Sequence, residues 1–221
     1  MRARQTSDKS VEAAVGEVVA KAGRIDLLVN NAGVGLVAGA EESSLAQAKS
    51  LFDVNLFGVI RMTKAVLPIM RLQRAGRIVN LSSVMGLIPA PFMALYAASK
   101  HAVEGYSESL DHEVRSWGVR VVLVEPAYTR TSFEGNVYEP DEQLDSYQSA
   151  RTNASGVLRD EMKVADTPEL VASAVLKASI KANPRRRYAA GRTARQVSLL
   201  RRLVPEAAFD RSLRKQMRLP A

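Results

Sequence analysis

The chain has 221 residues, of which 47% are hydrophobic and 24% are charged, a globular composition that excludes a disordered chain. It contains no cysteine, which excludes disulfide bonds and thiolate metal sites, and we expect no metal site of any kind. The first ten residues hold no apolar signal-peptide core, and no apolar run approaches the roughly 18 residues of a membrane span. We therefore expect one soluble, cytoplasmic α/β domain over 1–221.

The net charge of +8 is concentrated near the C-terminal end. Residues 184–221 carry eleven basic and two acidic side chains, a net charge of +9, so the preceding residues sum to −1. Nucleic-acid-binding domains usually interleave basic with aromatic residues, and this segment has only Tyr188 and Phe209. We expect no nucleic-acid partner and interpret 184–221 as a basic helical extension with solvated charges. Contact with an anionic partner or a membrane surface is the alternative.

Helical and strand patterns alternate along the chain. Apolar residues at helical spacing predict helices, and short apolar runs bounded by turns predict strands. In chain order we expect a helix at 10–22, a strand at 25–29, a long helix at about 44–72 interrupted by Gly58 and Pro68, a strand at 77–81, a helix at 92–116, a strand at 118–127 ended by Pro126, a helix at 168–182, a last strand within 186–191, and amphipathic helices at 194–203 and 207–217. Strands separated by helices imply a parallel sheet with helices on both faces.

Residues 128–167 are polar and show no regular pattern. Long segments of this kind often act as lids or binding segments, and disorder is the alternative. We predict an irregular substrate loop or lid over 128–167.

A tyrosine and a lysine stand four residues apart in the stretch ALYAASKHAVEGY, as Tyr96 and Lys100. Residues at i and i+4 share a helix face, so the ammonium can lie close to the phenol ring. A nearby cation favours the phenolate and lowers the pKa of tyrosine from its ordinary value near 10. Such a phenol can exchange a proton with an alcohol or a carbonyl. The pair alone is a weak signal, because chance produces it often.

Ser83 strengthens this interpretation. It stands 13 residues before Tyr96, directly after the predicted strand 77–81. A serine at the carboxyl end of a parallel strand faces the crevice where ligands bind. Ser83 is therefore placed to hold a substrate oxygen beside the phenol.

Five motifs occur in a fixed order along the chain: NNAG (30–33), FDVNLFG with Asn55, GRIVNLSS with Ser83, YAASK with Tyr96 and Lys100, and EPAYTRT (125–131). In type and order they resemble the short-chain dehydrogenases/reductases, and they span nearly the whole chain. The resemblance implies a Rossmann-like, doubly wound α/β fold followed by amphipathic C-terminal helices. It also implies a homodimer or homotetramer that pairs through the two long helices holding Asn55 and Tyr96.

The resemblance implies a role for each matching residue. Tyr96 would be the catalytic acid/base, and Ser83 would hydrogen-bond the substrate oxygen. Lys100 would lower the pKa of the tyrosine and hold the nicotinamide ribose, while Asn55 would keep a water in a proton relay. The alternatives are a strand-end cap for Ser83, a surface ion pair for Lys100 and a helix-bending residue for Asn55. The implied cofactor contacts are Asn30, Ala32, Gly33, Asn55, Tyr96, Lys100, Pro126, Thr129 and Thr131.

The glycine-rich opening of the family is not found. Family members begin with two βα units that hold the pyrophosphate and select between NAD and NADP. This chain starts where the third strand should be ending, so we expect an N-terminally truncated fold lacking about 60 residues and with an exposed sheet edge. GVGLVA (33–38) fits a dinucleotide fingerprint, but no helix is expected to open there. The cofactor is therefore NAD or NADP, with no preference readable.

Two interpretations of function remain open. The first is an NAD(P)-dependent oxidoreductase that interconverts a secondary alcohol and a ketone, acting on a hydrophobic small molecule. The apolar stretch 86–95, together with Phe133 and Tyr138, would wall its substrate site, although these side chains could instead pack as core. The C-terminal sequence also looks like the hydroxysteroid- and retinol-dehydrogenase-like branch. The second is a non-catalytic truncated homologue that acts as a binding or scaffold module.

Overall fold

A four-stranded parallel sheet forms the centre of the protein in the computed structural model, which describes residues 4–219. The strands lie in the order β1 (Leu27–Asn30), β3 (Gly76–Leu81), β4 (Val119–Pro126) and β6 (Arg187–Ala190). All three neighbouring pairs are parallel. The predicted parallel sheet is confirmed, with boundaries shifted by one or two residues.

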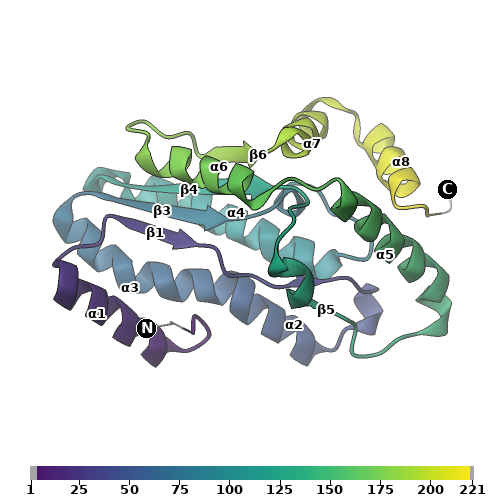
Figure 1. Cartoon of the computed structure of the whole chain (residues 1–221), viewed down its shortest axis with the longest axis horizontal. Coiled ribbons are helices and arrows are strands. Elements are labelled where there is room, and N and C mark those ends of the chain that lie inside the picture. The colour runs from purple at the N-terminus through teal and green to yellow at the C-terminus, as the bar shows by residue number, and fades with distance from the viewer. Residues whose placement is uncertain (1–3, 220–221) are drawn as a thin grey trace.

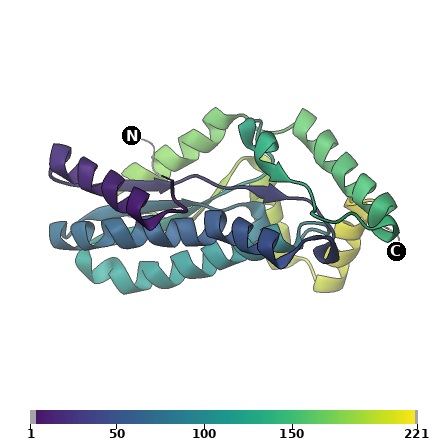
Figure 2. The ribbon, with the colours of Figure 1, turned by 90° about the horizontal axis from the view of Figure 1, so that it is seen from below.

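Helices cover both faces of this sheet (Figures 1 and 2). The first face carries α1 (Asp8–Ala22), α3 (Gly58–Gln73) and α4 (Ala94–Val114), whose apolar stripes pack on alternate strand residues such as Ile78 and Val121. The second face carries α6 (Pro168–Ile180) against Val79 and its neighbours. Because helices lie on both sides of parallel strands, the doubly wound α/β fold is confirmed.

The helix expected at 44–72 is a continuous run of three helical segments. α2 (Leu45–Phe52) begins at its cap Ser44, whose Oγ accepts a hydrogen bond from Gln47 N at 3.1 Å. A π-helical segment, Asp53–Phe57, follows and leads into α3, which keeps Pro68 inside it. The expected break at Gly58 is thus a change of helix type, and Asn55 sits within the π-helical segment. Such segments are rare and frequently lie at functional sites.

The prediction of an irregular segment at 128–167 is wrong. This segment contains β5 (Val137–Tyr138), which pairs in parallel with β2 (Gly35–Leu36), and the 16-residue helix α5 (Gln148–Lys163). Apolar spacing did not predict α5, because the helix buries only Ala154 and Val157 and so has too few apolar positions to set a helical pattern.

Glu42 anchors this segment to the body of the protein. Its side chain is fully buried, and its carboxylate accepts hydrogen bonds from Gly39 N at 2.8 Å and Leu144 N at 3.0 Å. The same carboxylate forms an ion pair with the Arg151 guanidinium of α5. One carboxylate therefore ties together the loop after β2, the chain before α5 and α5 itself.

Two further features match expectation. In the described part of the chain β1 pairs only with β3, which leaves its other edge open as expected. The C-terminal helices α7 (Arg192–Leu203) and α8 (Glu206–Gln216) lie beyond the carboxyl ends of the strands (Figure 1). Residues 220–221 of the expected extension lie outside the described residues. Between residues 4 and 219, no helix combines the length and apolarity needed to cross a membrane.

Candidate active site

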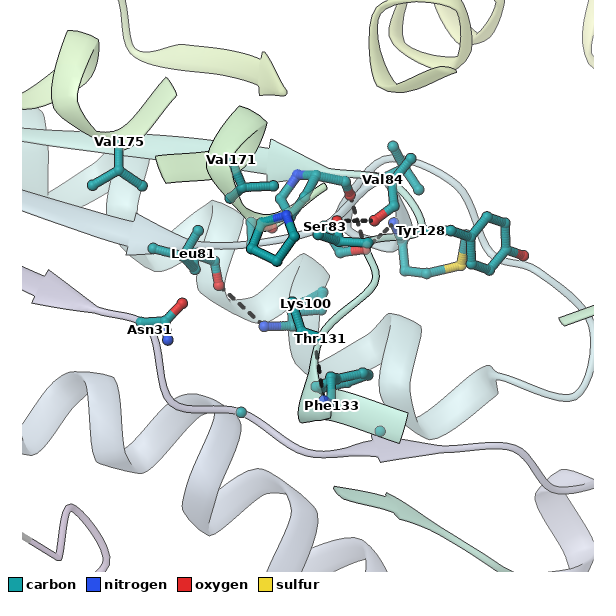
Figure 3. A pocket seen from close by; sticks show the side chains of 18 of the residues that line it. Asn31, Leu81, Ser83, Val84, Lys100, Tyr128, Thr131, Phe133, Val171 and Val175 are labelled. Atoms are coloured by element: carbon teal, nitrogen blue, oxygen red, sulfur yellow. Dashed lines mark hydrogen bonds between the residues drawn. The ribbon is translucent and has the colours of Figure 1, made fainter. Parts of the chain in front are cut away.

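A cavity of about 920 Å³ lies at the carboxyl ends of β1, β3 and β4. Its walls come from the loops after these strands, from α4, from residues 128–162 and from α6, which contributes Val171 and Val175 (Figure 3). Ligands of open parallel sheets bind at this place. The predicted site residues that line the cavity are Gly33, Ser83, Tyr96, Lys100, Pro126, Thr129 and Thr131.

Tyr96 lies in the first turn of α4 and is buried. Burial raises the pKa of its phenol to about 12, while a hydrogen bond from the Ser83 hydroxyl opposes the rise. Lys100 Nζ lies 5.8 Å from the centroid of the phenol ring. The expected lowering of the Tyr96 pKa by Lys100 is therefore not found, because desolvation prevails at this distance. At neutral pH Tyr96 is a neutral phenol, ready to donate a proton.

Lys100 is buried one turn further along α4. Its Nζ donates a hydrogen bond to the Leu81 carbonyl at 3.0 Å, as Figure 3 shows. Burial lowers the pKa of Lys100 to about 8, and the Glu104 carboxylate opposes this shift. The surface ion pair considered as an alternative for Lys100 is thus excluded, since the ammonium faces the cavity and a strand carbonyl.

The Asn55 side chain hydrogen-bonds to the loop after β1 and to α4. Its Oδ1 accepts a hydrogen bond from Val34 N at 2.8 Å, and its Nδ2 donates to Val34 O at 2.9 Å and to Ser99 Oγ at 3.1 Å. These bonds join the loop after β1 to α4. A Cβ built on Gly33 would lie 3.4 Å from Asn55 Oδ1 and 3.6 Å from Lys100 Nζ. Gly33 therefore lies close to both the Asn55 amide and the Lys100 ammonium.

The cofactor contacts expected at Asn30, Ala32 and Asn55 are not among the described lining of the cavity. Asn30 pairs with Asn80 in the sheet register, and its Nδ2 donates to Asn80 Oδ1 at 2.8 Å. Asn80 in turn donates to Ser107 Oγ of α4 at 2.8 Å. Asn30 is thus held toward the helix layer, and the next residue, Asn31, lines the cavity instead (Figure 3).

The part of the cavity lined by Ser83, Tyr96 and Lys100 is polar, and most of the remaining wall is apolar. Phe133 lies beside Tyr96, with 6.2 Å between the ring centroids, whereas Tyr138 packs with Leu36 in a separate core cluster. Most of the stretch 86–95 packs as core, and Met93 alone of it is among the described lining. Sequence reasoning missed a group that α5 contributes to the wall: Leu158, Arg159 and Met162.

A buried charged network lies behind Lys100. Glu104, one turn along α4, forms an ion pair with Arg187 of β6, which also pairs with Glu125 at 2.8 Å and Glu108 at 3.0 Å. Burial raises the pKa of Glu104 to about 8, the Glu125 carboxylate adds to the rise, and Ser82 and Arg187 oppose it. Burial and the nearby Glu125 carboxylate therefore raise the pKa of Glu104 by more than Arg187 lowers it.

Glu104→Gln is expected to flatten the pH dependence of stability. A carboxyl whose pKa is raised by folding stabilises the protein below its unfolded pKa near 4.5, and this contribution is lost as pH rises through about 8. The thermal unfolding midpoint of the wild type should fall between about pH 5 and about pH 8. In Glu104→Gln the fall should be several degrees smaller, as calorimetry can measure; an equal fall would contradict the raised pKa.

Comparisons with known proteins decide the family. The sequence profile of the short chain dehydrogenase family matches residues 2–142. The chain belongs to the short-chain dehydrogenase family. Members of this family are oxidoreductases, so the chain is an oxidoreductase by family. In the part of the chain that the structure describes, no three potential metal-ligating residues cluster together.

Two curated relatives illustrate the similarity of this family member. A 3-ketodihydrosphingosine reductase of Bacteroides thetaiotaomicron is 36% identical over 181 residues, which cover 81% of this chain and 67% of the relative. Retinol dehydrogenase 8 of Bos taurus is 47% identical over 133 residues, 60% of this chain and 42% of the relative.

Two solved structures show the same fold. A short-chain dehydrogenase from Streptomyces avermitilis superposes with a TM-score of 0.80 at 30% identity, covering 99% of this short-chain dehydrogenase and 76% of the other chain. The structure of ElxO with NADP bound has a TM-score of 0.68 at 26% identity and covers 83% and 71% of the two chains.

Proposed function

We propose that this short-chain dehydrogenase interconverts a secondary alcohol and a ketone with NAD or NADP, and that Tyr96 is its acid/base. The observation that carries the proposal is the convergence of Ser83, Tyr96 and Lys100 on one cavity at the carboxyl ends of the strands. Ser83 follows β3, Tyr96 and Lys100 lie on successive turns of α4, and all three side chains are buried. The non-catalytic alternative has no comparable observation in its favour.

The protein's own groups supply the proton chemistry. Tyr96, a neutral phenol with a pKa near 12, donates its proton to a carbonyl oxygen during reduction and accepts one from an alcohol during oxidation. Ser83 supports the oxygen that gains or loses this proton. Lys100, protonated near neutral pH, stabilises the phenolate left after proton donation. Asn55 holds the loop after β1 against α4 and is proposed to order a water in the proton relay.

The cavity fits the nicotinamide half of a dinucleotide cofactor. A ribose diol and a carboxamide need hydrogen-bonding partners, and Asn31, Lys100, Thr129 and Thr131 line the cavity with such groups beside Gly33 and Pro126. When bound, the nicotinamide ring supplies or accepts the hydride. The described residues offer no glycine-rich turn between a strand and a helix for the phosphates. We therefore assign no phosphate-binding turn within the described residues.

The proposed substrate is an apolar small molecule. The lining beyond Ser83 and Tyr96 is dominated by aliphatic, methionine and aromatic side chains, which favours an apolar body with few polar groups. The relative named 3-ketodihydrosphingosine reductase fits reduction of a ketone, and the relative named retinol dehydrogenase 8 fits oxidation of an alcohol. Residues 128–167 would act as the substrate lid that covers this body.

Assembly and location complete the proposal. We propose a homodimer or homotetramer that forms through the two long helices carrying Asn55 and Tyr96, and no nucleic-acid partner. We propose a cytoplasmic location, which the absence of cysteine fits because disulfides are rare there.

The test of function is a panel of ketones of increasing apolar surface, assayed with the chain and millimolar NADPH or NADH. We expect oxidation of the reduced cofactor that depends on the ketone and is fastest with the more apolar members. Cofactor oxidation that is independent of every ketone, in a folded protein, would contradict the proposal.

Lys100→Met is expected to weaken turnover and cofactor binding together. The ammonium serves both the Tyr96 phenolate and the cofactor ribose, and a hydrogen bond to a charged group contributes about 1.5–3 kcal/mol, so cofactor affinity should fall roughly 10- to 100-fold. Cofactor titration followed by calorimetry measures the affinity, and steady-state kinetics measure turnover. A loss confined to ketone affinity would refute the proposed role.

A further inference from the structure

The C-terminal half of α7 carries three exposed leucines. Leu199, Leu200 and Leu203 on this helix are 59%, 49% and 72% exposed. Leu199 and Leu203 stand four residues apart and share one face, with Leu200 beside them. Single exposed leucines are ordinary on protein surfaces, whereas three within one turn of one helix form a patch that marks an interaction site.

These leucines are not needed to hold α7 in place. The opposite face of the helix carries Ala194 and Val197, which pack in the cluster that contains Val84, Met85 and Tyr96. Val84, Met85 and Tyr96 also line the active-site cavity. α7 therefore has two apolar faces, one against the cavity wall and one toward solvent.

Positive charge surrounds the outward leucines. Arg192, Arg195 and Arg202 of α7 are exposed, and residues 192–216 carry seven basic and two acidic side chains, a net charge of +5. An exposed apolar stripe flanked by arginines is typical of helices that lie in the interface of a lipid bilayer. Anionic headgroups attract each nearby arginine with about 1 kcal/mol, roughly a fivefold gain in binding.

We propose that α7 is a membrane-contact helix, which lies in the headgroup layer of an anionic bilayer with Leu199, Leu200 and Leu203 inserted and its arginines on the headgroups. A second copy of the chain is a less suitable occupant, because a symmetric contact through α7 would oppose two basic surfaces. The bilayer would then lie about one helix diameter, 10–12 Å, from the cavity wall. This arrangement would suit the proposed apolar substrate, which partitions into lipid, but the membrane contact itself does not depend on that proposal.

The test is co-sedimentation of the chain with vesicles of phosphatidylcholine alone or of phosphatidylcholine mixed with phosphatidylserine. We expect binding to the mixed vesicles that weakens as salt is raised, and much less binding to phosphatidylcholine alone. This measurement needs no cofactor and no turnover. It can therefore succeed or fail independently of the oxidoreductase assay.

Matched variants locate the contact. Leu199→Ser with Leu203→Ser should reduce partitioning onto the mixed vesicles at least tenfold, because their burial in the interface is lost. Arg195→Gln with Arg202→Gln should reduce it by a similar factor and weaken its salt dependence. The controls change equally exposed residues on helices α1 to α3: Leu45→Ser with Leu72→Ser, which are 78% and 84% exposed, and Lys9→Gln with Lys49→Gln.

Each outcome decides the proposal. Loss of vesicle binding in the α7 variants with retention in the controls, at unchanged thermal stability, supports it. Equal binding by α7 variants and wild type overturns it, as does the absence of binding to anionic vesicles. Sedimentation velocity that shows a dimer dissociated by Leu199→Ser and Leu203→Ser, without vesicle binding, would instead assign the patch to a second copy.

Discussion

Tyr96→Phe is expected to reduce ketone reduction by a factor of about 10² to 10⁴, the usual contribution of a positioned general acid. The substitution removes the only atom of the side chain that carries a transferable proton. It keeps the ring, which lies beside Phe133 and under Lys100. Steady-state kinetics at millimolar cofactor measure the loss, and the folded state is checked by thermal unfolding.

The matched control for this variant is Tyr128→Phe. Tyr128 lines the same cavity, and burial also raises the pKa of its phenol. It lies after β4, away from the first turn of α4, and has no proposed part in proton transfer. We expect Tyr128→Phe to keep turnover within the same order of magnitude. Equal losses in the two variants would point to a general need for polar groups in the cavity and would refute the specific role of Tyr96.

Glu42→Ala is expected to destabilise the protein by about 3–5 kcal/mol, the cost of leaving one partner of a buried ion pair uncompensated. The substitution strands the Arg151 guanidinium and removes the acceptor of Gly39 N and Leu144 N. For a chain of this size the unfolding midpoint should fall by roughly 10 °C. Amide hydrogen exchange should accelerate most in residues 139–151, and the apolar wall supplied by α5 should bind substrate less well.

The neighbouring residue supplies the control for Glu42. Glu41 is exposed, and its carboxylate accepts a hydrogen bond from the Tyr147 hydroxyl at 3.0 Å. Because exposed contacts of this kind contribute little, Glu41→Ala should shift the midpoint by no more than about 2 °C. A Glu42→Ala protein as stable as the wild type, with unchanged exchange at 139–151, would show that the segment is held by other contacts.

The sequence predicted best the elements with a strong apolar period. Apolar residues at helical spacing predicted a long helix from about residue 44, and the valine-rich run at 119–124 predicted the central strand β4. Five motifs also placed Ser83, Tyr96 and Lys100 in one cavity. The helix and the strand are local features, because each depends on the spacing of residues within one element, whereas the site residues were predicted from the family resemblance.

The features that the sequence did not predict depend on tertiary packing. α5 buries too few residues to set a pattern, and it is held by the distant Glu42. The choice between Asn30 and Asn31 depends on register, because Asn30 faces Asn80 across the β1–β3 pair. The pKa of Tyr96 depends on how fully other segments bury the phenol, and a pair of residues at i and i+4 cannot report that burial.

The most direct test follows the hydride with an isotope label and tests the proton donor by substitution of Tyr96. The chain is incubated with an apolar ketone and a reduced nicotinamide cofactor that carries deuterium at the transferable position, and the product alcohol is weighed by mass spectrometry. We expect the wild type to form an alcohol that carries the deuterium on its carbinol carbon, and Tyr96→Phe to form much less of it. Deuterated alcohol formed equally well by Tyr96→Phe would contradict the account, as would its absence from every ketone tested with the folded wild type.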